Sequence, residues 1–248
     1  MKRIARLIFL LIVLSAPQSI FAQWAERDLP RLYDELKASQ NSNDTSKMIS
    51  NYINLANAYQ LLNIPDSSFY YNTSALKISI LKRDTAAMSG CYTNLGAETF
   101  NRGLYRLSEE YLCKAVHLDS ITGNERQLAL NLSFLGLVYG IQYIDNPDDT
   151  TFRDKAMDKV KKTLHLNGDV FSRFNAYYAA TQYYMWQNMD DSTTYYYEKF
   201  CEEAPKTPFQ PMTVSLNVDY MIYFKQYRKA LEYLQKNISC FQQSKISM

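Results

Sequence analysis

Apolar and small residues recur along this chain with a fixed period of about 40 residues. Leu55–Ala56, Leu95–Gly96 and Leu135–Gly136 follow one another at that interval, and so do Ala75–Leu76 and Ala115–Val116. Around these pairs, apolar positions return three and four residues apart, which is the spacing of one face of an α-helix. A fixed period between about 20 and 50 residues indicates a stack of repeated supersecondary units. The pattern therefore predicts an all-α solenoid.

We expect a leading helix followed by about five helix–turn–helix units. The leading helix and its linker occupy residues 23–46. Pro30 suits the first turn of this helix, because proline lacks the N–H that a first turn leaves unpaired. The repeat array occupies residues 47–248, and its predicted units are 49–82, 89–122, 129–167, 173–203 and 211–244. No run of alternating β-branched residues between turn signals predicts a strand.

Polar and small residues mark the ends and the close contacts of the predicted helices. Short polar side chains before a helical pattern are typical N-caps. The residues expected to cap helix N-termini are Asp44 or Thr45, Asp66 or Ser67, and Asp191–Ser192. Gly123 suits the C-terminal end of a helix, where a left-handed residue is common. Small side chains at Ala56, Ser68 and Ala75 would let the two helices of a unit approach closely.

Residues 1–22 have the layout of a secretory signal peptide. Lys2, Arg3 and Arg6 precede an unbroken apolar run at 7–14, and Ala22 offers a small residue for cleavage. That apolar run is shorter than the roughly 20 residues that span a membrane. We therefore expect an exported protein of the periplasm or cell envelope, with no membrane span after cleavage. The alternative is a segment that stays uncleaved as an N-terminal anchor.

Composition and charge narrow the class of partner. Glycine and proline, seven residues each, are scarce, which favours long regular helices. The full chain has 27 Lys and Arg against 25 Asp and Glu. Without the three basic residues of the leader, 24 basic residues face 25 acidic ones, so the mature net charge is near −1. No basic stripe remains, which argues against nucleic acid and against an anionic membrane surface.

The spacing of these residues resembles the tetratricopeptide repeat (TPR). This family uses a helix–turn–helix unit of about 34 residues with the signature W-x2-L-G-x2-Y, followed by a small residue, an aromatic residue and proline. In the second unit, Leu95–Gly96 stands at the Leu-Gly position, Gly103 in the turn and Ala115 at a later small position. The longer period and the missing proline depart from the pattern. The resemblance implies an exported bacterial TPR protein, folded as a right-handed superhelix with a concave groove lined by the first helices.

Such grooves bind extended peptides or partner helices, and the resemblance transfers that expectation to this chain. The residues expected to line the groove are Asn54, Asn57, Asn94, Phe134, Tyr177, Thr181 and Tyr184. An asparagine amide can both donate to and accept from a peptide backbone. Asn57 and Asn94 also match two positions of a carboxylate-binding clamp known in the family. Its basic positions hold Ile53, Leu130 and Phe134 instead, so a charged carboxylate would lack its cation. The aromatic side near Tyr177, Tyr178 and Tyr184 favours an apolar or mixed ligand, and the alternative is that these rings pack between helices.

Metal binding is not expected. His117, His165 and Cys201 fall at one position of successive units. Packed helices lie about 8–10 Å apart, whereas each ligand must sit about 2.0–2.3 Å from a shared zinc ion. The acidic segment 145–149 lacks the spacing of a calcium loop.

Cys91 and Cys113 form the candidate disulfide. They lie on the two predicted helices of one unit, and an exported protein meets an oxidising compartment. A disulfide requires Cα atoms within about 7 Å. The alternative is that both are free, small core residues.

The sequence contains no nucleophile elbow, metalloprotease motif, phosphate-binding loop or dinucleotide fingerprint. We therefore expect no enzyme and no cofactor. The first hypothesis is a scaffold that binds a protein or peptide in the groove. The second is the extracytoplasmic sensor region of a membrane-bound signalling or transcriptional regulator, because the array shows no polar C-terminal cap.

Overall fold

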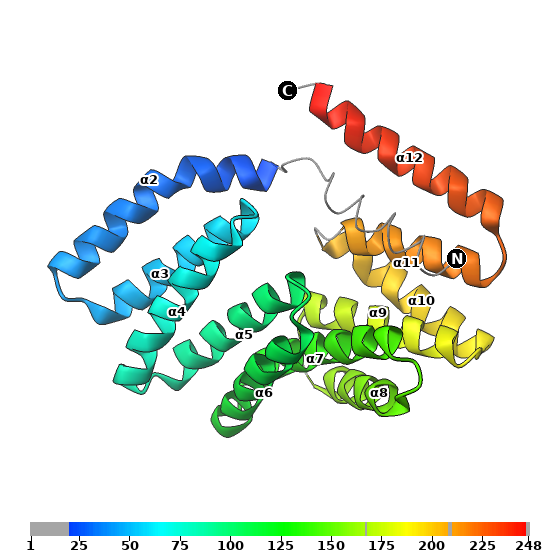
Figure 1. The fold of residues 1–248 in the computed structure, drawn as a ribbon, viewed down its shortest axis with the longest axis horizontal. Helices are drawn as coiled ribbons and strands as arrows, with labels where there is room; N and C mark the ends of the chain where they lie inside the picture. The colour runs from blue at the N-terminus through cyan, green and yellow to red at the C-terminus, as the bar shows by residue number, and fades with distance from the viewer. Residues whose placement is uncertain (1–19, 167, 208–209, 247–248) are drawn as a thin grey trace. The chain divides into compact units, whose positions relative to one another are not determined.

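The computed structural model describes residues 20–166, 168–207 and 210–246. Within those residues the chain forms eleven α-helices, one short 3₁₀ helix and no strand (Figure 1). The helices are α2 (Ile20–Asn41), α3 (Thr45–Leu61), α4 (Pro65–Lys82), α5 (Thr85–Asn101), α6 (Tyr105–Thr122), α7 (Glu125–Asp145), α8 (Thr150–His165), α9 (Val170–Trp186), α10 (Asp190–Glu203), η1 (Ala204–Lys206), α11 (Gln210–Tyr223) and α12 (Tyr227–Ile246). The prediction of an all-α chain is confirmed. The predicted signal peptide lies outside the described residues except for its last three, which begin α2.

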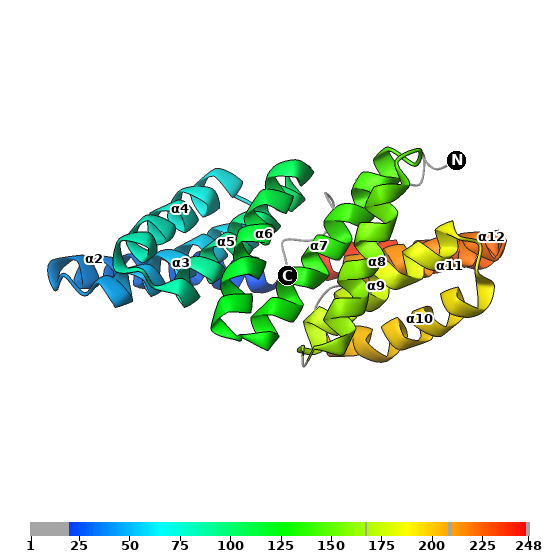
Figure 2. The same ribbon diagram turned by 90° about the horizontal axis from the view of Figure 1, so that it is seen from below.

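The described chain divides into two compact units, and the division falls within α9. One unit is Ile20–Ala176, and the other begins at Tyr177. In Ile20–Ala176, each helix from α2 to α7 packs against the next one along the chain. Figures 1 and 2 show α3 with α4, α5 with α6, and α7 with α8 as consecutive hairpins. In addition, α3 contacts α5 and α5 contacts α7, so the first helices of successive hairpins are neighbours. This packing is compatible with a solenoid.

Left-handed backbone residues recur with the same period as the apolar pairs. Asn43, Arg83 and Gly123 have φ of 52°, 55° and 68°, and each precedes the first helix of a hairpin. Asn63 and Gly103, which are one period apart, have φ of 55° and 74° within the hairpin turns. Asparagine and glycine adopt this conformation readily, whereas it costs a residue such as Arg83 about 1 kcal/mol. The turns therefore repeat as closely as the helices do, and Gly123 is a C-cap as predicted.

The N-caps of the first helices repeat as well. Asp44, Asp84 and Asn124 follow one another at the period of the apolar pairs. Each accepts a hydrogen bond from the backbone N–H three residues later, at 3.1, 3.0 and 3.3 Å respectively. Each bond satisfies one of the backbone N–H groups that the start of a helix leaves unpaired. Of the two residues proposed for the first of these caps, Asp44 is the one that acts.

The predicted caps of two second helices are wrong. Helix α4 begins after Ile64 and α10 after Met189, and neither residue makes a side-chain capping bond. Both helices begin earlier than predicted, so Asp66–Ser67 and Asp191–Ser192 lie inside the first turn. A carboxylate there still interacts favourably with the positive end of the helix dipole.

Pro30 does not begin the leading helix. Helix α2 starts at Ile20, so Pro30 lies in its interior. Proline inside a helix removes one hydrogen bond and clashes with the preceding turn, which produces a kink. Figure 1 shows α2 bent about halfway along its length.

Small residues bring the helices of each hairpin together, as predicted. Ala56, Ser68 and Ala75 are almost completely buried between α3 and α4. In the next hairpin, Gly96 of α5 lies directly against Leu112 of α6. A Cβ added at Gly96 would stand 2.7 Å from Leu112 Cγ, which is too close for any real contact. Leu112 is itself fully buried, so it has no space into which to retreat.

One described helix, α7, is long and apolar enough to cross a membrane by length and composition alone. In this structure, 56% of its apolar window is buried. It packs against α6 on one side and α8 on the other, with Leu135 and Val138 fully covered.

Gly96→Ala should destabilise the chain by about 1–3 kcal/mol, because overpacking at Leu112 outweighs the gain of up to about 1 kcal/mol in helix propensity. The control is Gly90→Ala in the same helix, where an added Cβ meets nothing within 4 Å. That variant should be neutral or slightly stabilising. Urea unfolding followed by circular dichroism measures both, and equal stabilities for the two variants would contradict the close-contact argument.

Candidate functional site

Three asparagines from three helices meet on one surface of the unit Ile20–Ala176. Asn94 of α5 donates from Nδ2 to Asn72 Oδ1 of α4 at 3.2 Å and to Asn57 Oδ1 of α3 at 3.5 Å. Asn57 is exposed, Asn94 is half-buried and Asn72 is buried. The structure therefore brings together two of the predicted groove residues. Asn54, a third, is exposed on α3.

Asn72 is a member of this cluster that the sequence interpretation missed. It lies on a second helix, four residues after the small residue Ser68, where the repeat signature has an aromatic residue. The amide at a position where the repeat signature has a ring was the sequence feature that could have identified Asn72. A buried amide needs a hydrogen-bond partner, and Asn94 supplies it.

Phe134 of α7 is half-buried and packs on its neighbours. Its ring meets Phe171 of α9 edge-to-face, with centroids 5.8 Å apart. It also lies against a core cluster that includes Leu112, Leu135 and Val138. Contacts between helices therefore cover part of this ring.

The predicted aromatic residues of the second unit stack on Tyr196 of α10. The ring of Tyr184 lies parallel to that of Tyr196, with centroids 5.1 Å apart, and Tyr177 lies 6.4 Å away at a tilt. Both rings remain half-buried. Burial and the neighbouring rings raise the pKa of Tyr184. Thr181 does not line any open surface, because it is fully buried and donates to the Tyr177 carbonyl at 2.8 Å. A threonine hydroxyl bonded to the preceding turn is satisfied within its own helix.

A second aromatic group in this unit was not predicted. Tyr197 of α10 and Tyr220 of α11 stack with centroids 3.6 Å apart and nearly parallel planes. Tyr197 donates its hydroxyl to Asn217 Oδ1 at 2.9 Å, and Asn217 donates to the Tyr233 hydroxyl of α12 at 2.6 Å. The run of three tyrosines at 195–197 was the sequence signal. These contacts tie α10, α11 and α12 together.

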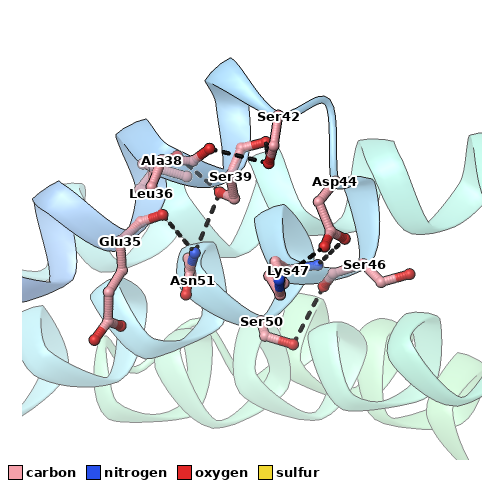
Figure 3. Close-up of polar contacts among 10 residues, drawn as sticks. All are labelled: Glu35, Leu36, Ala38, Ser39, Ser42, Asp44, Ser46, Lys47, Ser50 and Asn51. Atoms are coloured by element: carbon pink, nitrogen blue, oxygen red, sulfur yellow. Dashed lines mark hydrogen bonds and ion pairs between the residues drawn. The ribbon is translucent and has the colours of Figure 1, made fainter.

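Buried polar contacts at a constant spacing join two of the hairpins, α3–α4 and α7–α8, to the helix that precedes each of them. Figure 3 shows Asn51 of α3 donating to Ser39 Oγ at 3.2 Å and to the Glu35 carbonyl of α2 at 3.0 Å. Two periods further along the chain, Asn131 of α7 donates to Asp119 Oδ2 of α6 at 2.7 Å. We refer to the Asn51–Ser39 and Asn131–Asp119 contacts, each between residues 12 positions apart, as the polar clips. Their position between packed helices indicates a structural role.

Cys91 occupies the middle of this series and explains why the candidate disulfide is not formed. Both Cys91 and Cys113 are free. Cys91 is buried against α3 and α4, where its thiol meets Ser79, and burial raises its pKa to about 11. Cys113 is exposed and has Tyr139 and Lys159 as neighbours, on α7 and α8. The two thiols point to opposite sides of the hairpin, which the spacing along the sequence did not reveal.

Among the described residues, no three His, Cys, Asp or Glu side chains lie close enough together to hold a metal ion. His117 and His165 are both exposed.

Desolvation raises the pKa of two aspartates, Asp119 and Asp219. Asp119 is 1% exposed, and desolvation raises its pKa although Ser89 and Asn131 donate to it at 2.6 and 2.7 Å. In the second unit, Asp219 of α11 has its pKa raised to about 6 by desolvation, with Gln182 as its hydrogen-bond partner.

Asp119→Ala should lower the free energy of unfolding by about 2–4 kcal/mol, because it leaves the donors of Ser89 and Asn131 buried without a partner. Asp119→Asn should cost less than about 1 kcal/mol, since the amide can accept from Asn131 while the serine hydroxyl accepts from it. Urea denaturation at neutral pH distinguishes the two. If both variants lost the same free energy of unfolding, the Asn131–Asp119 contact would depend on the charge of the carboxylate and not on its hydrogen bonds.

The stability of the second unit should fall as the pH rises from about 4 to 7. The folded state holds the Asp219 proton to about pH 6, whereas an unfolded aspartate titrates near about 3.9. The resulting stabilisation is complete below the unfolded value and is lost as pH rises through the folded one, by no more than about 3 kcal/mol. Asp219→Asn should flatten this part of the profile of thermal unfolding against pH. An unchanged slope in the variant would assign the dependence to another group.

Comparison with known proteins identifies a fold. No protein-family model matches this chain, and no curated protein matches its sequence. Among solved structures, 33 chains match. One is the crystal structure of BtubC (BKLC) from P. vanneervenii, which superposes with a TM-score of 0.55 at 14% identity, over 77% of this chain and 90% of that chain. At this identity the likeness shows the fold alone, an all-helical, repeat-like architecture.

Proposed function

We propose that this chain is an exported, non-catalytic scaffold of about five TPR-like repeats that binds a protein or peptide partner. In this proposal the repeats form a right-handed superhelix, and the first helices of the hairpins line its concave groove. The leader-like segment at residues 1–22 supports export, and the absence of catalytic motifs from the sequence supports a binding role. The all-helical fold shared with BtubC supports the architecture in this proposal, not the export or the binding.

The observation that carries the proposal is the amide cluster of Asn57, Asn94 and Asn72. It joins neighbouring first helices, α3 and α5, at a surface where Asn57 is exposed. Amides held in a fixed orientation can hydrogen-bond to a polypeptide backbone without demanding one side-chain sequence. The nearby Asn54 extends this surface along α3.

Replacing Asn54 and Asn57 together by alanine should reduce partner capture by at least about tenfold without changing stability, because exposed polar residues contribute within about 0.5 kcal/mol to folding. The measurement is affinity capture by the purified mature protein from an envelope extract of its own cell, with quantitative mass spectrometry of the bound proteins.

The matched control replaces two exposed residues of second helices, Lys77 of α4 and Glu110 of α6, by alanine. It should capture the same proteins as the unmodified chain. If the asparagine variant is folded by circular dichroism and captures the same proteins in the same amounts, the first helices are not the binding surface.

A further inference from the structure

Ionic residues are distributed unequally between the two sets of helices in Ile20–Ala176. The second helix α8 carries seven, which are Arg153, Asp154, Lys155, Asp158, Lys159, Lys161 and Lys162. The first helix α3 has one ionic residue, Lys47, in its first turn. Helix α7 has Glu125 and Arg126 in its first turn and Asp145 as its last residue.

Helix α5 has a single ionic residue, Glu98, and that residue is turned away from the surface. It is 3% exposed, desolvation raises its pKa, and its carboxyl group lies beside Ser68 of α4. The central turns of α3, α5 and α7 therefore present no exposed charge. We call this surface the neutral face.

Register defines which residues the neutral face contains. Asn54, Asn94 and Phe134 occupy equivalent positions of successive repeats on α3, α5 and α7. These helices are neighbours, and the Asn94–Asn57 contact confirms that α3 and α5 share this surface. Ala97 of α5 is half-buried beside Asn94. The residues named for this face are amides and apolar groups, and none of them is charged.

The amides on this face are already oriented. Asn94 donates from Nδ2 to Asn72 and Asn57. Its side-chain carbonyl oxygen is therefore the acceptor for the N–H of an incoming peptide. Asn57 accepts with Oδ1, so its Nδ2 group, on an exposed residue, is the donor for an incoming C=O. One acceptor and one donor side by side match the two groups of a peptide unit in an extended chain.

A charge brought onto such a surface would lose water without gaining a counter-ion, which costs free energy. A neutral peptide loses only polar groups that the amides can replace. We infer that the neutral face of α3, α5 and α7 binds an uncharged, extended peptide segment through its backbone and apolar side chains, with no ionic anchor. This inference rests on the proposed function. Three helices about 9–10 Å apart span roughly 20 Å, which is the length of about six extended residues.

The test uses a synthetic array of roughly eight-residue peptides built from Ala, Val, Leu, Ser, Thr, Asn and Gln, acetylated and amidated at their ends. Each binding peptide is compared with versions carrying one central Glu, one central Lys or a free C-terminal carboxylate. Fluorescence anisotropy with the mature protein gives Kd. The charged versions should bind at least about tenfold more weakly, and Kd of the neutral peptide should change less than about twofold between roughly 50 and 500 mM NaCl.

Asn54→Lys places a cation on the neutral face at an exposed position. It should weaken the neutral peptides and strengthen the Glu-containing versions by about fivefold or more. The control is Ser120→Lys, an exposed position on α6, which should leave every Kd unchanged.

Three outcomes overturn the inference. These are the absence of any neutral binder, tighter binding of a charged version, and a Kd that weakens about tenfold with salt. If charged peptides bind best and the Asn54→Ala/Asn57→Ala variant abolishes that binding, the scaffold function stands and only the uncharged partner class is wrong. If that variant leaves peptide binding intact, both proposals fail.

Discussion

The structure depends on the close contact between the two helices of each hairpin. At Gly96 and Leu112 there is no room for a methyl group, and at Ala56, Ser68 and Ala75 the side chains are small and fully covered. Close packing at one point fixes where both helices must begin and end, because their turns have to fall at matching heights. The left-handed residues and the Asp or Asn caps then recur with the period of that contact as a consequence. A change at the contact would therefore alter the separation of the two helices that it joins.

The first and second helices of the hairpins differ in the charge that they carry. The second helices carry most of the ionic residues, which keep that side solvated. The first helices contact one another. Their central helical turns carry amide and apolar side chains and no exposed charge. A charge on a half-buried first helix would have to lose water without a partner, as the raised pKa of Glu98 illustrates. The packing thus allows a surface in which recognition rests on hydrogen bonding and shape.

Much of this architecture could be predicted because it depends on local chemistry repeated at a fixed interval. The Leu-Gly pairs, the Asp44 cap and the C-terminal Gly123 are each visible within a few residues of sequence. The misses have a different origin. Pro30 fits either the start or the bent interior of a helix, and only the length of α2 decides between them. Thr181 and Cys91 were placed on helices correctly, but which neighbour each side chain meets depends on tertiary packing. Asn72 was missed because its position holds a core ring in the repeat signature, so it was not considered among the groove residues.

The regular period of about 40 residues ends after α7. Helix α7 is one turn longer than α3 or α5, and the interval from Asn131 to its equivalent Asn175 exceeds the regular period by about one helical turn. Stacked tyrosines join helices on both sides of that point. Tyr59 stacks on Tyr71 between α3 and α4, and Tyr197 stacks on Tyr220 between α10 and α11. In the second unit, hydrogen bonds through Asn217 extend this contact to α12. A flat ring tolerates a wider range of helix separations than a glycine contact does, since it can slide on its partner while staying in van der Waals contact. A tyrosine stack can therefore persist where the interval between helices changes, whereas Gly96 cannot shift towards Leu112 without a clash.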